Sequence, residues 1–260
     1  MPVSLNGATS GSVTLTAPAV AGTNTLTLPA VTDTLVGLAA TQTLTNKTLT
    51  GTALAAGTAS VAPFNLTSGT NLTTATAGAV EYDGTVFYAT PTASQRGVIM
   101  AEQIILLQAA YTLTSQTAAQ KLFNTPASGQ VTLSVGTYEF ECFYSLSSLS
   151  STSSTFGFAL GGTATFTQFF QSLAIRNGTV SSPTAPNTTY NIAANTNISG
   201  NSTATTGYAN ISGIINVSVS GTVIPQVSLG VAAAAIVGIG AYFRIRPIGS
   251  TTVTSVGNWS

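Results

Sequence analysis

Four charged residues at regular spacing are the clearest candidates for chemistry in this chain. Glu139 and Glu141 alternate along the segment GTYEFECFYSL, and Arg244 and Arg246 alternate in the same way along AYFRIRPIG. Side chains two positions apart on a β-strand project from the same face of a sheet. Two such strands could pair their glutamates with their arginines, and we predict a structural charge ladder that fixes strand register or a contact between subunits.

Two carboxylates on one strand face could instead act as the acid and base of a glycosidase. A retaining enzyme holds its two carboxyl groups about 5 Å apart, a distance that Glu139 and Glu141 could span. The chain would then be a polysaccharide depolymerase. Catalytic carboxylates normally face each other from different strands across a cleft, and the sequence shows no acidic or aromatic groove around this strand. We therefore expect no enzymatic activity and keep the depolymerase as an alternative.

The composition excludes most other catalytic and metal chemistry. The chain has no histidine, which is the commonest general base and the commonest metal ligand. Its single cysteine, Cys142, is expected to be a small core residue, with a reactive thiol as the alternative. Glu81 and Asp83 are the candidates for a calcium site, but two carboxylates are too few for an ion that takes six or more oxygen ligands. We predict no metal site and no cofactor.

Charge is scarce along the whole sequence. The 260 residues include six Lys and Arg and six Asp and Glu, so 5% of the chain is charged and the formal net charge is zero. Roughly a quarter of a typical soluble domain is charged. A surface near zero net charge favours association, so we expect assembly. No basic stripe is present for phosphate neutralisation, so we expect no nucleic-acid partner.

Alternation of apolar and polar residues predicts an all-β chain. Residues 136–146 alternate in this way, and one face of the predicted strand would carry Tyr138, Phe140, Cys142, Tyr144 and Leu146. Several short apolar runs between Gly97 and Gly249 are bounded by Gly, Pro or polar residues, which is typical of a β-sandwich or jelly roll. AEQIILLQAA, residues 101–110, could be a short helix or a buried strand, and we interpret it as the first strand of the sandwich.

Further strands are predicted nearer the N-terminus. Thr alternates with apolar residues in Val13–Thr16 and again in Leu26–Leu28. The segment GAVEYDGTVFYATP, residues 78–91, has Asp83-Gly84 between two alternating runs. This pattern predicts a hairpin with a two-residue type I′ turn.

Residues 1–78 carry too few large apolar side chains to form a core in one chain. Burial contributes about 25 cal/mol per Å² of apolar surface, whereas ordering the backbone costs about 1–2 kcal/mol per residue. Asp33 and Lys47 are the only charges in this segment, unlike in a highly charged disordered chain. We expect a β-rich, intertwined segment whose core is shared between chains.

The apolar segment VSLGVAAAAIVGIGAYF, residues 227–243, is close to the length of a transmembrane helix. Because Ala and Gly make up most of it, we predict a pair of strands buried between subunits and no membrane insertion. The N-terminus, MPVSLNGATSG, lacks the basic and apolar regions of a secretory signal.

Residues 177–210 form the longest polar stretch of the C-terminal region and are predicted to be an outward loop. Long loops inside compact domains are often functional, and Tyr with Asn and Ser is the composition of adaptable binding surfaces. A solvated loop or a strap between subunits is the alternative. The candidate receptor-binding residues are Tyr190, Tyr208, Asn187, Asn195 and Asn197.

Several phrases resemble those of tail-fibre and related virion proteins of tailed bacteriophages. They are LTLPAVTDTLVG, QTLTNKTLTG and GAVEYDGTVFY. The part from AAYTLTSQTAAQKLFN through GTYEFECFYSLSSLS to YFRIRPIG resembles the head domain attached to such fibres, which is similar in kind to trimeric jelly rolls of the tumour-necrosis-factor type. The resemblance implies a homotrimer, in which three sparse chains pool one core about a closed symmetry axis.

The resemblance also implies a domain order and a role. The expected parts are an N-terminal virion-attachment and fibre region (1–78), a hairpin connector (79–97), a jelly-roll head domain (98–250) and a C-terminal tail (251–260). We expect a short trimeric tail fibre that attaches the phage to its host. Its partners would be other virion proteins at the N-terminal region and a host cell-surface glycan or protein. It would be assembled in the host cytoplasm and lie on the virion surface, with a head fibre or capsid decoration protein as the alternative.

Overall fold

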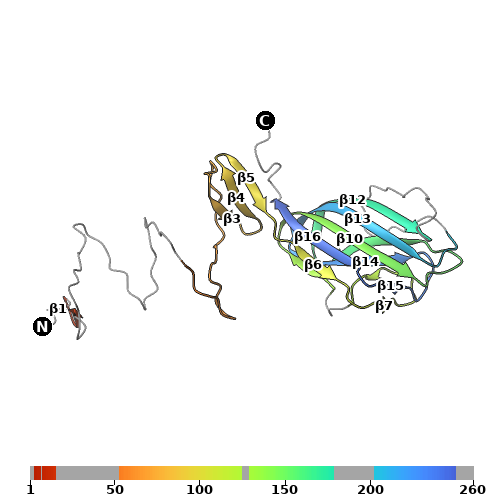
Figure 1. Cartoon of the computed structure of the whole chain (residues 1–260), viewed down its shortest axis with the longest axis horizontal. Coiled ribbons are helices and arrows are strands. Elements are labelled where there is room, and N and C mark those ends of the chain that lie inside the picture. Colours follow the sequence, from red (N-terminus) through yellow and green to blue (C-terminus); the bar gives the residue numbers. More distant parts are fainter. Residues whose placement is uncertain (1–2, 7, 16–52, 125–128, 179–201, 250–260) are drawn as a thin grey trace. The chain divides into compact units, whose positions relative to one another are not determined.

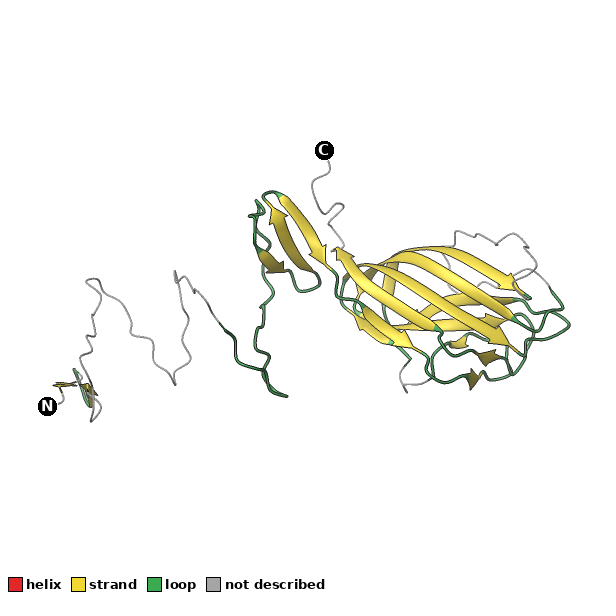
Figure 2. Cartoon of the chain, in the orientation of Figure 1, coloured by secondary structure: helices red, strands yellow, loops and turns green. Residues whose placement is uncertain are grey.

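The computed structural model describes residues 3–6, 8–15, 53–124, 129–178 and 202–249. Every regular element in these ranges is a β-strand, as Figure 2 shows, so the predicted all-β class is confirmed. The chain divides into two units, Met1–Gly57 and Thr58–Ser260. Among the described residues of the first unit, β1 (Val3–Asn6) and β2 (Ser12–Leu15) pair as an antiparallel hairpin. The strand predicted at 26–28 lies outside the described residues.

The second unit contains a small antiparallel sheet made of β3 (Val80–Tyr82), β4 (Phe87–Thr92) and β5 (Gln95–Ile99). The predicted hairpin is confirmed, but the predicted two-residue turn is wrong. Tyr82 pairs with Phe87, so four residues, 83–86, form the loop. A type I′ turn needs positive φ at both central residues, and only Gly84 has it, at +100°.

The side chain of Asp83 explains the longer loop. Its Oδ1 accepts hydrogen bonds from the backbone amides of Thr85 and Val86, both at 2.8 Å, and its Oδ2 accepts one from the Tyr88 hydroxyl at 3.0 Å. An aspartate that satisfies amides of its own turn offers the backbone an alternative to the tight turn. Val86 is fully buried in this arrangement, and the Tyr82 and Phe87 rings stack with centroids 4.2 Å apart.

Two antiparallel sheets form a β-sandwich in the rest of the second unit (Figure 1). The larger sheet contains β6 (Gln103–Leu106), β7 (Tyr111–Thr112), β10 (Gly136–Ser147), β12 (Thr165–Asn177), β13 (Gly207–Val219), β15 (Ile236–Val237) and β16 (Tyr242–Gly249). The smaller sheet contains β8 (Gln120–Lys121), β9 (Val131–Leu133), β11 (Phe156–Gly162) and β14 (Gly221–Leu229). The chain passes repeatedly between the sheets, as in Greek-key and jelly-roll sandwiches.

The core lies between the two sheets and is centred on β10. Side chains of β10 alternate between buried and partly exposed along its whole length, as predicted. Phe140 is 1% exposed. Its ring lies 6.2 Å from that of Phe158 in the smaller sheet and about as far from those of Phe169 and Phe243 in its own sheet, at 6.0 Å each. Cys142 is fully buried in the same row, as a core residue should be.

Three further expectations about strands can be compared with the structure. The segment 101–110 contains β6, so its interpretation as a strand is confirmed. Residues 227–243 contain the end of β14, all of β15 and the start of β16, and the described residues include no helix long and apolar enough to cross a membrane. The outward loop predicted at 177–210 is wrong at its C-terminal end, because β13 begins at Gly207 and Tyr208 pairs within the sheet.

Candidate functional site

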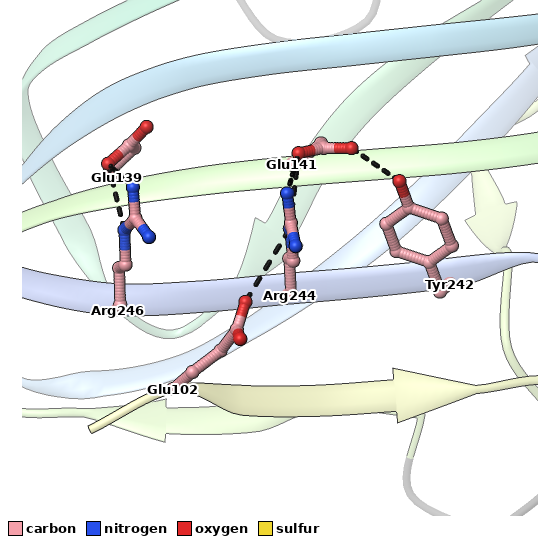
Figure 3. Close-up of polar contacts among 6 residues, drawn as sticks. All are labelled: Glu102, Glu139, Glu141, Tyr242, Arg244 and Arg246. Atoms are coloured by element: carbon pink, nitrogen blue, oxygen red, sulfur yellow. Dashed lines mark hydrogen bonds and ion pairs between the residues drawn. The ribbon is translucent and has the colours of Figure 1, made fainter. Parts of the chain in front are cut away.

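The register of the larger sheet brings the four alternating charged residues together. β10 pairs with β16 so that Glu139 lies opposite Arg246 and Glu141 lies opposite Arg244. Both pairs project from the face of the sheet that points away from the core, because the neighbours of the two glutamates on β10, Phe140 and Cys142, are buried on the opposite face. Figure 3 shows the two pairs side by side on their neighbouring strands.

The pair at one end of the ladder is simple. Arg246 donates from Nε to Glu139 Oε2 at 2.9 Å and from Nη2 to the same oxygen at 2.6 Å. The side chains are 33% and 45% exposed. Ion pairs in contact with water stabilise a fold by under about 1 kcal/mol, so this pair fixes register more than it adds stability.

The pair at the other end belongs to a larger group. Arg244 Nε donates to Glu141 Oε2 at 3.1 Å, and its Nη2 bonds the same oxygen. The Tyr242 hydroxyl donates to the other carboxylate oxygen, Oε1. Glu102, immediately before β6, joins the group, with its Oε1 3.5 Å from Arg244 Nε.

Sequence reasoning missed Glu102 and Tyr242. Tyr242 lies two positions before Arg244, so its place on the same strand face was a usable signal. Glu102 reaches the group only because β6 pairs with β16, with Ile104 opposite Arg244. No local pattern in the sequence predicts that pairing.

The electrostatics of the group keep Glu141 ionised. The hydrogen bond from Tyr242, followed by those from Arg244 and its positive charge, lowers the pKa of Glu141 although partial burial acts in the opposite direction. The same hydrogen bond to Glu141 is the main cause of the raised pKa of Tyr242. A glycosidase acid needs the opposite shift, a raised carboxyl pKa. Glu141 is therefore suited to pair with the Arg244 guanidinium and not to donate a proton.

The hollow at this group is too small for a sugar. It is lined by Glu102, Glu139, Glu141, Arg244 and Arg246, together with Phe140 and Ile245, and has a volume of about 20 Å³. That space holds about one water molecule. The arrangement can therefore bind a water among paired charges, but it does not form a polysaccharide cleft.

Replacing Glu141 with Gln should change how stability depends on pH. A carboxylate whose folded pKa is lowered contributes stability that is present above its unfolded pKa, about 4.3, and is lost as the pH falls through the folded pKa. The difference in melting temperature between wild type and Glu141→Gln should therefore be largest above about pH 5 and should shrink toward pH 2. Thermal melts from pH 2 to 7 measure it. A difference that stays constant over this range would show that the charge of Glu141 is not what stabilises the fold.

Glu81 and Asp83 serve the small sheet. Glu81 accepts hydrogen bonds from the Leu72 amide at 2.6 Å and from Arg96 Nε at 2.9 Å. Burial raises the pKa of Glu81, but these two partners together lower it below its ordinary value. Within the part of the chain that the structure describes, no group of three or more His, Cys, Asp or Glu residues is placed to hold a metal ion.

Of the five candidate receptor-binding residues, Tyr208 is the one that lies in the described part of the chain. Tyr190, Asn187, Asn195 and Asn197 lie outside the described residues. Tyr208 is half-buried in β13, opposite Ser145 of β10 and Arg176 of β12. The structure therefore places Tyr208 on a sheet, whereas the sequence predicted a loop.

Fold and site together define the chain as an antiparallel β-sandwich protein with an internally paired charge cluster on one sheet. Comparison with protein-family models, with curated proteins and with solved structures found no match in any of the three.

Proposed function

We propose that this chain is a structural protein of a tailed-phage virion, a short trimeric tail fibre that attaches the particle to the host surface. The resemblance of its sequence phrases to virion proteins suggests the class of protein. Its scarce charge and zero net charge favour assembly into a particle.

The observation that carries the proposal is the exposed apolar stretch before the small sheet. Residues 58–79 contain no strand, and Val61 and Phe64 are each 64% exposed. Large side chains that one chain leaves in water favour burial against other chains, since each contributes about 1.5–3 kcal/mol when it is buried. Intertwined copies, or a docking site on the virion, would provide that burial.

The charge cluster supports a structural role over an enzymatic one. Both alternating glutamates are bonded to guanidinium groups, and the hollow beside them has room for about one water. A polysaccharide depolymerase would need a free carboxyl pair beside a cleft that admits a sugar chain. The expected partner is a host glycan or surface protein that is bound without being cleaved.

Labelled virions test the location. Antibody fragments against residues 98–250, bound to particles of the phage that encodes this chain, should mark the tail tip in negative-stain images. Label on the capsid would favour the head fibre or decoration protein, and particles without label would contradict a virion protein.

Adsorption tests the role. Purified chain, incubated with host cells before infection, should occupy receptors and lower phage adsorption, with only weak dependence on salt because few charges are available for long-range attraction. The Tyr190→Ala chain should compete less well while it melts like wild type. Release of reducing ends from host polysaccharide by the purified chain would instead support the depolymerase.

A further inference from the structure

The small sheet and the sandwich are joined along the chain by a short exposed linker. It consists of residues 100–102, between the end of β5 and the start of β6. All three residues are exposed, and Met100 is 62% exposed. Parts joined only by such a linker move relative to one another unless a second contact holds them. The loop 83–86 of the small sheet makes a second contact.

Thr85 in this loop contacts the turn between β9 and β10. Its hydroxyl donates a hydrogen bond to the Val135 carbonyl oxygen at 3.0 Å. Gly136, the next residue, is buried at the first position of β10. A Cβ on Gly136 would lie 2.7 Å from the Thr85 methyl carbon, Cγ2, and 3.2 Å from the Gly249 carbonyl oxygen. The absence of a side chain at position 136 therefore lets the loop approach the turn closely.

Both partners of the Thr85 hydrogen bond are held in place by their own surroundings. On the side of the small sheet, the Thr85 amide donates to Asp83 Oδ1 at 2.8 Å. On the side of the sandwich, Tyr138 is 4% exposed and donates its hydroxyl to the Ser134 carbonyl oxygen at 3.0 Å, beside Val135. Groups that are already ordered lose little conformational freedom when they meet, so the contact costs little entropy.

The electrostatics of Tyr138 also place the loop beside the sandwich. Burial is the main cause of the raised pKa of Tyr138, and the hydrogen bond to Ser134 acts in the opposite direction. The phenol of Tyr82 and the carboxylate of Asp83, both from the small sheet and its loop, raise the pKa further. Charges act on one another in this way over short distances.

We infer that the loop 83–86 is a latch that fixes the orientation of the small sheet relative to the sandwich. The latch consists of Thr85, bonded to Val135 and seated over Gly136. The linker alone allows rotation, whereas the linker and the latch together attach the small sheet at two points and prevent it. Whatever binds the small sheet then sets the direction in which the sandwich points.

Distance measurements between spin labels test the latch in the full chain. Gln95→Cys and Thr132→Cys place the labels on exposed positions of β5 and β9, and Cys142 is buried and stays unlabelled. Labelled chains are mixed with an excess of unlabelled chains, so that distances within one chain are measured in any oligomeric state. Wild type should give one narrow distribution of distances. A broad distribution in wild type would overturn the latch.

Two substitutions should release the small sheet. Thr85→Val removes the hydroxyl donor, and Gly136→Ala adds a methyl group where Thr85 sits, so each should broaden the distance distribution about twofold or more. Thr92→Val is the matched control, because Thr92 is exposed on β4 of the same sheet, and its distribution should stay as narrow as that of wild type. Unchanged distributions in both Thr85→Val and Gly136→Ala would overturn the inference.

Cleavage of the linker gives a second measurement without labels. A glutamate-specific protease cuts after Glu102, at the end of the linker, when the backbone there opens. Cleavage after Glu102 should be about fivefold faster in Thr85→Val than in wild type, because the loss of a hydrogen bond raises the population of the open form. Thr92→Val should be cut at the wild-type rate.

Cleavage after Glu81, within β3, reports whether the small sheet itself stays folded. Its rate should be the same in wild type and in Thr85→Val, because the latch joins two folded parts and does not form either of them. Equal rates after Glu102 in wild type and Thr85→Val would overturn the latch. An equal gain after Glu81 and Glu102 would also overturn it, since Thr85 would then stabilise the small sheet and not its orientation.

Discussion

Replacing Phe140 with alanine should lower the free energy of unfolding by about 3–5 kcal/mol, as for other fully buried aromatic residues. Phe140 is 1% exposed and lies at the centre of the sandwich. Its ring packs near rings from both sheets, those of Phe158, Phe169 and Phe243. Truncation would leave a cavity that all three neighbours border, and rigid strands on either side can close it only in part.

Thermal melts at a fixed protein concentration measure this effect. For a domain of about 150–250 residues, each kcal/mol shifts the melting temperature by about 2–4 °C, so a decrease of about 6–20 °C is expected. Phe140→Leu is the control, because it retains much of the volume and should lose clearly less stability. If Phe140→Ala melted within about 2 °C of wild type, this ring would not lie at the centre of the core.

Replacing Gly213 with alanine should cost about 3 kcal/mol although it adds only one methyl group. Gly213 lies opposite Phe140 on β13. A Cβ at this position would lie 2.2 Å from the Phe170 carbonyl oxygen and 2.6 Å from a ring carbon of Phe140. The first contact is with backbone of the neighbouring strand, so relief requires β12 and β13 to move apart. Equilibrium denaturation in urea measures the loss.

Two further variants distinguish the steric clash of a Cβ at position 213 from the general effect of replacing a glycine with alanine in a strand. Gly97→Ala in β5 is the matched control, because its nearest contact would be the Ala89 carbonyl oxygen at an ordinary 3.8 Å, and we expect a change of less than about 0.5 kcal/mol. Gly213→Ala combined with Phe140→Leu should cost less than the sum of the two single changes, because removing the ring relieves one of the two collisions. Additive costs would contradict the contact between Gly213 and the Phe140 ring.

Local patterns in the sequence determined the main strand and the spacing of the site. Alternation along residues 136–146 predicts which side chains of β10 are buried, because a strand turns successive side chains to opposite faces whatever its partners are. For the same reason, Glu139 and Glu141 share one face and so do Arg244 and Arg246. Equal spacing on two strands makes a ladder possible, and the antiparallel register of β10 and β16 then pairs each glutamate with an arginine.

Only the tertiary structure decided which strands meet, because strand pairing joins residues that are far apart in the chain. Glu102 reaches Arg244 through the pairing of β6 with β16, and Tyr208 belongs to a sheet because β13 pairs with both β10 and β12. Gly213 is required by the backbone of one neighbouring strand and the aromatic ring of another. The turn at Asp83 was missed for a local reason. Its carboxylate bonds two amides of the loop and the hydroxyl of Tyr88, and the type I′ pattern of Asp-Gly takes no account of a side chain five residues away.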